Sequence, residues 1–190
     1  MKFLAAVAVT VTLALTSSAA SASTSRIPDA AGDVWVIVDS GVTAEQPTDH
    51  VTNVDLLGVR VETGPRALTV RVSFVELVRN DDRIHLRTTF RTDRQMHRVV
   101  QFGIWPRKPR GTAVISRLHR RNVSCSGLVA TIDRVADVVR LVVPLSCLDR
   151  PRWVQHKTLA TTIRDHEWFL DAAGSATARP AGWSARLITG

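Results

Sequence analysis

The sequence predicts an all-β protein: an antiparallel β-sandwich of jelly-roll or immunoglobulin-like type, with about nine to ten strands and one disulfide. Three observations predict this fold. Apolar and polar residues alternate along most of the chain, turn-forming stretches recur at short intervals, and no amphipathic helical pattern separates them. The alternation has the period of a strand with one buried face, so two sheets are expected to stack on a common core.

The expected strands follow one another along the chain. Apolar side chains recur at every second position in ALTVRVSF (67–74), RIHLRTTF (83–90) and RVVQFGIW (98–105). Turn-forming residues fill the stretches between strands, namely TGPR (63–66), RNDD (79–82), TDRQ (92–95) and PRKPRG (106–111). We expect strands at 34–38, 54–62, 67–77, 83–91, 97–105, 112–118, 128–133, 137–143, 152–163 and 183–188, and a loop or irregular crossover at 165–181.

The first 22 residues have the pattern of a signal peptide. Lys2 precedes an apolar run at 3–15, and Ala20-Ser21-Ala22 is a small-x-small cleavage signal. The run is shorter than the roughly 20 residues that a transmembrane helix needs. We therefore predict a secreted, extracellular protein whose residues 23–190 form a single β-sandwich domain, with no transmembrane segment in the mature form.

Two cysteines, Cys125 and Cys147, suit the oxidising compartment to which such a protein is exported. They flank two strand-like stretches, GLVATID and DVVRLVV, whose turn falls near RVAD (134–137). Opposed residues of a hairpin lie at equal distances from its turn, so the cysteines lie nearly opposite each other at the open end. We predict a disulfide worth roughly 3 kcal/mol; two free buried thiols are the alternative.

The motif DAAGDVW (29–35), followed by NVDLLGVRVETGPRALTVRVSFVEL (53–77), resembles the first hairpin of DOMON-like and family-9-like carbohydrate-binding β-sandwiches. The chain also resembles a group of uncharacterised secreted actinobacterial proteins. These share DxxGDV, D(I/L)xxVxV, a cysteine pair and a PRWV stretch, here at 151–154. The resemblance implies the sandwich, and it implies ligand binding by analogy of fold.

Seven acidic residues gather in the segment from Ile27 to Glu62, where Arg60 is the only Lys or Arg: Asp29, Asp33, Asp39, Glu45, Asp49, Asp55 and Glu62. One interpretation is that they form turns and face the basic residues elsewhere in the chain. The other is a Ca²⁺ site built from Asp29, Asp33 and Asp55, because Ca²⁺ takes six to eight oxygen ligands. The first has the wider support, since the segment lacks the ligand spacing of an EF-hand loop.

The chain has a formal net charge of +8, and its basic residues concentrate at 83–121, where Asp93 is the only acid. Arg87 and Arg91 fall on one strand face with His85. Such a patch attracts polyanions, among them cell-wall phosphate polymers and acidic glycans. The alternative is a solvated sheet face, and no motif for specific nucleic-acid binding accompanies the charge.

Five tryptophans occur and no tyrosine. Trp105 has the parity opposite to Phe102 and Ile104, which predicts that it points away from the core, where its ring could stack on a sugar. The alternative is that the tryptophans pack in the core or at its rim.

Sequence motifs for catalysis are absent: there is no G-x-S-x-G, no H-E-x-x-H, and no reactive cysteine once the pair is bonded. We therefore predict a non-enzymatic binding module for a cell-wall or extracellular glycan or polyanion. Arg87, Arg91 and Trp105 are its expected ligand-binding residues, and Ca²⁺ is the only candidate cofactor. The alternative is a structural or protein-interaction domain with no small ligand.

Overall fold

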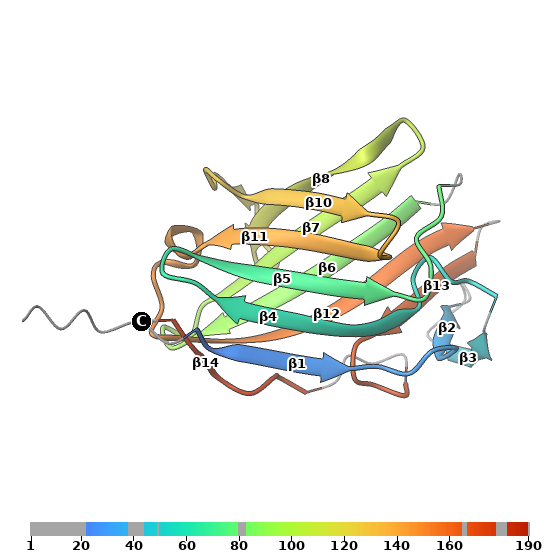
Figure 1. Cartoon of the computed structure of the whole chain (residues 1–190), viewed down its shortest axis with the longest axis horizontal. Helices are drawn as coiled ribbons and strands as arrows, with labels where there is room; N and C mark the ends of the chain where they lie inside the picture. The colour runs from blue at the N-terminus through green and yellow to red at the C-terminus, as the bar shows by residue number, and fades with distance from the viewer. Residues whose placement is uncertain are drawn as a thin grey trace, which may run out of the picture.

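A computed structural model describes residues 22–37, 44–48, 50–79, 83–164, 167–177 and 182–189, with side chains described for all of these except 44–47. Two antiparallel sheets lie against each other as layers, which confirms the predicted β-sandwich (Figure 1). The predicted signal peptide lies outside the described residues except for Ala22, and it stays a prediction. In the part of the chain that the structure describes, no helix has the length and apolarity to cross a membrane.

The smaller sheet has five strands in the order β1-β4-β5-β11-β10. These are β1 (Thr24–Pro28), β4 (Leu56–Thr63), β5 (Ala67–Phe74), β11 (Val138–Pro144) and β10 (Val129–Asp133). The β4–β5 and β10–β11 pairs are hairpins of neighbouring strands. β1 and β10 therefore form the two edges of this sheet.

The larger sheet has nine strands, eight of them in the order β3-β2-β13-β12-β6-β7-β8-β9. These are β3 (Ala44–Thr48), β2 (Val34–Ile37), β13 (Glu167–Ala172), β12 (Trp153–Arg164), β6 (Arg83–Thr92), β7 (His97–Trp105), β8 (Lys108–Arg117) and β9 (Asn122–Val123). The ninth, β14 (Leu187–Ile188), pairs with the start of β12. This sheet brings an early and a late segment of the chain side by side, because β2 pairs with β13.

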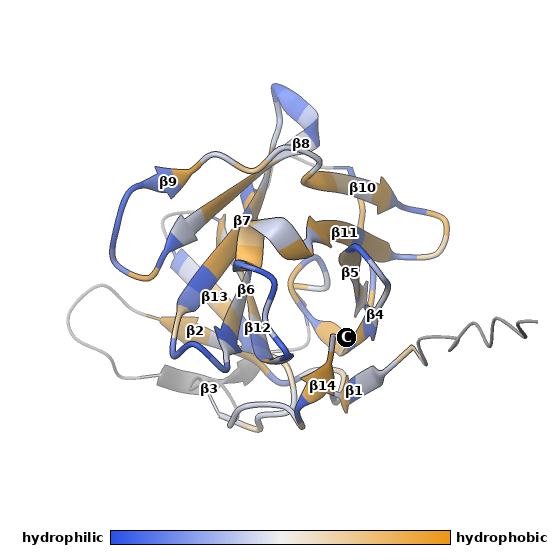
Figure 2. Ribbon diagram, turned by 90° about the vertical axis from the view of Figure 1, so that its left-hand side faces the viewer, coloured by the Kyte–Doolittle hydropathy of each residue, from blue (hydrophilic) through white to orange (hydrophobic). Residues whose placement is uncertain are grey.

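One hydrophobic core fills the space between the sheets, with buried residues from both. Apolar and polar bands alternate along the strands, as the sequence predicts (Figure 2). All four phenylalanines of the described chain are buried in the core: Phe74, Phe90, Phe102 and Phe169. The tryptophans are not part of this core cluster.

Several strands differ from the sequence prediction, among them β9, which was not expected, and β14, which is shorter than the expected strand at 183–188. β13 lies within the expected loop at 165–181, and that prediction is wrong because its inward positions alternate an apolar Phe169 with a polar Asp171. β1 and β3 were not expected, since TSRIP and AEQPT are mostly polar. β8 begins at Lys108, inside the predicted PRKPRG turn, so the turn is shorter than expected.

The predicted disulfide is confirmed: Cys125 bonds Cys147, with their Cα atoms 5.5 Å apart. Cys147 lies in a short 3-10 helix, η1 (Leu145–Leu148), directly after β11. Arg98 of β7 is almost fully buried and reaches across the sandwich to this helix. Its Nε donates to the Cys147 carbonyl (3.2 Å), and its Nη2 lies 2.7 Å from Asp149 Oδ2. The disulfide and Arg98 thus hold this end of the sandwich together.

An arginine ladder crosses the outer face of the five-stranded sheet. Four exposed arginines lie directly opposite one another on neighbouring strands, in the order Arg26, Arg60, Arg71 and Arg140. Among these, Arg60 has an ion pair, with Glu62 at 2.7 Å. Like charges directly opposite each other in a sheet are destabilising.

We expect Arg71→Thr to stabilise the protein by about 0.5 kcal/mol, because it removes the charge between two arginines and places a β-branched residue in a strand. Urea unfolding in low salt measures this gain. The gain should shrink in 1 M NaCl, where the repulsion is screened. A gain that does not change with salt would assign the effect to strand propensity alone.

His156 of β12 is completely buried between the sheets, with its Nε2 3.2 Å from Ser25 Oγ of β1. Burial lowers the pKa of His156 from 6.5 to about 4. As the pH falls, His156 therefore binds a proton near pH 6.5 in the unfolded chain but only near pH 4 in the folded chain. Stability from the neutral ring is complete above pH 6.5 and is lost as the pH falls from there towards 4.

Replacing this ring should flatten the acid side of the stability profile. Relative to His156→Gln, the wild type is expected to lose about 1.4 kcal/mol per pH unit between pH 6.5 and 4. Urea unfolding of both proteins at pH 7, 6 and 5 gives this difference, in which contributions from other groups cancel. Parallel profiles would contradict this, because they would show that the pKa of His156 is the same in the folded and unfolded chains.

Candidate functional site

The DAAGD motif forms the turn that leads from one sheet to the other. β1 of the five-stranded sheet ends at Pro28, the chain turns through 29–33, and β2 of the nine-stranded sheet begins at Val34. Gly32 has a φ of 83°, a left-handed conformation that glycine adopts without strain. This turn brings Asp29 and Asp33 to the space between the ends of the two sheets.

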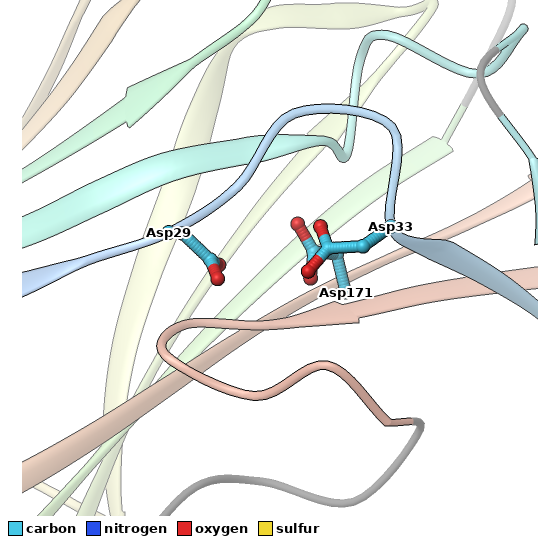
Figure 3. Close-up of side chains that lie close together, drawn as sticks. All are labelled: Asp29, Asp33 and Asp171. Carbon is cyan, nitrogen blue, oxygen red and sulfur yellow. The ribbon is translucent and has the colours of Figure 1, made fainter.

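Two further aspartates meet this turn. Asp55 directly precedes β4, and Asp171 lies on β13 with its side chain pointing inward; both are buried, at 2% and 0% exposure. One oxygen each from Asp29, Asp33 and Asp171 lies within 4.8 Å of the others (Figure 3). Asp55 interacts electrostatically with Asp29 and Asp33. We call these four residues the carboxylate cluster.

Backbone N–H groups hold the cluster in place. They donate to one oxygen of three of its side chains: Gly174 N to Asp29 Oδ1 (3.0 Å), Gly32 N to Asp55 Oδ2 (2.8 Å) and Leu56 N to Asp171 Oδ2 (2.6 Å). The second oxygen is buried and has no hydrogen-bond partner among the described residues; Asp33 also has one such oxygen. These four atoms are Asp29 Oδ2, Asp33 Oδ1, Asp55 Oδ1 and Asp171 Oδ1.

The cluster is costly to ionise. The pKa of Asp29 is raised to about 7 and that of Asp171 to about 8. Burial is the largest cause of both shifts, and repulsion from neighbouring carboxylates contributes to them. Burial is also the largest cause of the raised pKa values of Asp33 and Asp55. In the part of the chain that the structure describes, no Lys, Arg or His nitrogen lies within 4.0 Å of the four side chains.

The early acids therefore divide into two groups. Of those with described side chains, Glu62 forms an ion pair with Arg60 of the same segment, and not with the basic residues elsewhere in the chain that the turn-and-pairing interpretation expects. The three aspartates of the predicted Ca²⁺ site do lie together, and Asp29 and Asp33 also begin and end a turn. The side chains of Asp39, Glu45 and Asp49 lie outside the described residues.

The predicted ligand-binding residues lie on the outer face of the nine-stranded sheet. Trp105 is half-buried, with its ring 5.5 Å from that of His85 and packed over Gly103, where a Cβ would stand 2.4 Å from the ring. Arg87 lies opposite Gln101 and Arg91 opposite His97. Arg91 is exposed, whereas Arg87 is half-buried and its Nε has no hydrogen-bond partner among the described residues.

All five tryptophans share this outer face. Strand alternation places Trp35, Trp105, Trp153 and Trp168 there, because their neighbours Val34, Ile104, Val154 and Phe169 are core residues. Trp183 lies on the same face, with Lys157 Nζ 5.0 Å and the His97 ring 5.5 Å from its own ring. Trp168 is the most open, at 47% exposure; the others are half-buried.

Basic side chains accompany these rings. The outward positions of β6, β7 and β12 carry Arg83, His85, Arg87, Arg91, His97 and Lys157. Burial lowers the pKa of His85, with Arg83 adding to the effect, so this ring is mainly neutral at pH 7. The outward positions of β2, β13, β12, β6, β7 and β8 in the paired, described residues carry no Asp or Glu.

Sequence reasoning identified part of each site. It missed Asp171 and Trp168 because both lie on β13, in the segment expected to be a loop. The stretch WFLDA gives no clear period of two, because apolar residues occupy both parities and Asp171 takes an inward position. Trp183 could not be placed by strand alternation either, since it precedes the two-residue β14.

No family model, curated protein or solved structure matches the chain. The resemblance to DOMON-like and family-9-like sandwiches therefore stays a prediction, and the function rests on the geometry of the chain itself.

Proposed function

We propose that this protein is a non-enzymatic extracellular binding module. Its ligand is an acidic glycan that lies across the outer face of the nine-stranded sheet. The observation that carries this proposal is the separation of the aromatic residues: every described phenylalanine is in the core, and every tryptophan is on one outer face. Core packing would have distributed both kinds of ring between the sheets.

Tryptophan suits a surface that binds a partly apolar ligand. Its ring offers a large apolar area and its indole N–H a hydrogen bond, which is why it is enriched at interfaces. Sugar rings have apolar C–H faces that pack on such rings. Trp168 and Trp35 lie on neighbouring strands, and Trp105 ends β7 at the same end of the sheet. The positions of these three tryptophans support a binding site that contacts several sugar residues of a polymer.

The charge of the face favours an anionic polymer. Arg83, Arg87 and Arg91 recur at every fourth position along β6, and Lys157 lies on the neighbouring strand β12. Arginine binds carboxylate and phosphate through two parallel hydrogen bonds.

Binding to defined polymers tests the proposal. The probes are polygalacturonate, which carries carboxylates, a glycerol-phosphate teichoic acid, which carries phosphates, and neutral dextran, all measured by isothermal titration calorimetry. We expect one or both anionic polymers to bind and dextran to bind far more weakly. Trp168→Ala and Arg87→Gln should each weaken binding about tenfold or more, as removal of a central interface residue does.

Arg71→Gln is the matched control, because it removes the same charge from the arginine ladder on the other sheet and should change affinity less than about twofold. Equal weakening by Arg71→Gln and Arg87→Gln would overturn the proposal in favour of unspecific charge attraction. Binding of neither anionic polymer would also overturn it and favour the structural or protein-interaction alternative.

A further inference from the structure

We infer that the carboxylate cluster is a Ca²⁺ site that joins the two sheets. This inference does not rest on the proposed function, because the cluster lies between the sheets and the tryptophan face lies outside them.

Four buried oxygens without a hydrogen-bond partner carry the inference. An unpaired polar atom in a protein interior is costly, and nearly all such atoms are paired with protein or water. Here one from each residue of the cluster lacks a partner among the described residues, and two of these, Asp55 Oδ1 and Asp171 Oδ1, belong to side chains exposed by 2% or less. All four are acceptors. A cation held by Asp29, Asp33 and Asp171, which each place one oxygen within 4.8 Å of the others, would satisfy acceptors of this kind, and Asp55 lies beside them.

The backbone contacts orient the carboxylates for this role. In Asp29, Asp55 and Asp171, an N–H group occupies one oxygen and leaves the other free. Hydrogen bonds of this kind fix ligand orientation at metal sites. A buried carboxylate pair that only shared a proton would satisfy two of the oxygens, whereas the cluster presents four.

The donor set selects the ion. Carboxylate oxygens favour hard cations, whereas Zn²⁺ takes nitrogen and sulfur ligands readily, and neither a cysteine nor a histidine belongs to the metal-competent group among the described residues. Oxygens on opposite sides of one Ca²⁺ are about 5 Å apart, twice the Ca–O distance, and one oxygen each of Asp29, Asp33 and Asp171 lies within 4.8 Å of the others. Asp29 and Asp33 are half-exposed, so water can complete the six to eight ligands.

The site would act as a clamp between the layers. Asp29 directly follows β1 of the five-stranded sheet, whereas Asp33 directly precedes β2 and Asp171 belongs to β13, both of the other sheet. Ca²⁺ bound to these three carboxylates would therefore link the two sheets. A ligand that binds only the folded chain raises its apparent stability in proportion to the logarithm of its concentration.

Thermal unfolding of the purified protein tests the inference, in EDTA and then in CaCl₂ or MgCl₂ from 0.1 to about 5 mM. We expect the unfolding temperature to rise by several degrees with CaCl₂ and to rise less with MgCl₂, which keeps its water and demands octahedral geometry. Calorimetric titration should give one Ca²⁺ per chain.

Asp171→Asn supplies a test with a change of sign. In EDTA this variant should be more stable than the wild type, because folding of the wild type must either protonate Asp171 or bury its charge without a counterion, and an amide requires neither. In CaCl₂ the unfolding temperature of the variant should rise little, and its affinity for Ca²⁺ should be at least about tenfold lower than that of the wild type. Asp33→Asn breaks no hydrogen bond between strands and should also bind Ca²⁺ weakly. This variant replaces Asp171→Asn in the test if Asp171→Asn fails to fold.

Glu62→Gln is the matched control, since it neutralises a neighbouring early acid outside the cluster and should respond to Ca²⁺ as the wild type does. An unchanged unfolding temperature of the wild type at millimolar Ca²⁺, with no heat of binding, would overturn the inference. So would a full Ca²⁺ response in both aspartate variants.

Discussion

Phe102→Ala is expected to lower the free energy of unfolding by 3–5 kcal/mol, about the cost of removing a fully buried phenylalanine from a core. Phe102 lies on β7 with 1% of its surface exposed, among core residues of both sheets. Its loss removes apolar burial and leaves a cavity that neighbouring strands fill only in part. Urea unfolding followed by tryptophan fluorescence measures the change. The loss is a large share of the stability of a typical domain.

Gln101→Ala is the control for this result. Gln101 precedes Phe102 on the same strand and is exposed on the outer face, so its replacement should change stability by less than about 0.5 kcal/mol. Similar losses for the two variants would contradict the alternation that assigns one face of β7 to the core. Phe102→Leu, which keeps much of the volume, should fall between them.

Removing the disulfide is expected to cost about 3 kcal/mol. Cys125 and Cys147 are 22 positions apart, and the bond restricts that loop in the unfolded chain. We expect the double variant Cys125→Ala/Cys147→Ala to unfold at a lower urea concentration, while the bond from Arg98 to the Cys147 carbonyl remains possible because it uses the backbone. The unfolding midpoint and its slope give the difference.

The wild type reduced with dithiothreitol is the comparison, and it should unfold at about the same urea concentration as the double variant. A loss below about 1 kcal/mol in both would show that the unfolded loop is already restricted without the bond. A loss in the alanine variant alone would assign the effect to side-chain packing of Cys147, which is 8% exposed.

The central strands could be predicted because each buries one face, and burial of one face imposes a period of two on the sequence. β5, β6 and β7 show it plainly. The edge strand β3 could not be predicted, because its sequence has few apolar residues and so lacks this period. β13 was missed because an aspartate, Asp171, occupies one of its inward positions and breaks the apolar pattern.

The sites divide in the same way. Asp29, Asp33 and Asp55 could be predicted from a local motif and a neighbouring hairpin, and the outward direction of Trp105 from its parity. Asp171 could not, because its partner Leu56 is 115 positions away on the other sheet, and only the packing of the two sheets brings them together. Likewise, the arginine ladder depends on the register of four strands, which a sequence pattern does not fix.

The long sequence separations within the carboxylate cluster have a kinetic consequence. Leu56 contacts Asp171 across 115 positions, and Asp29 contacts Gly174 across 145. Such contacts form late, after shorter loops have closed. A cation bound there would meet a nearly finished fold, so it would slow the escape from the native state and leave the rate of reaching it almost unchanged.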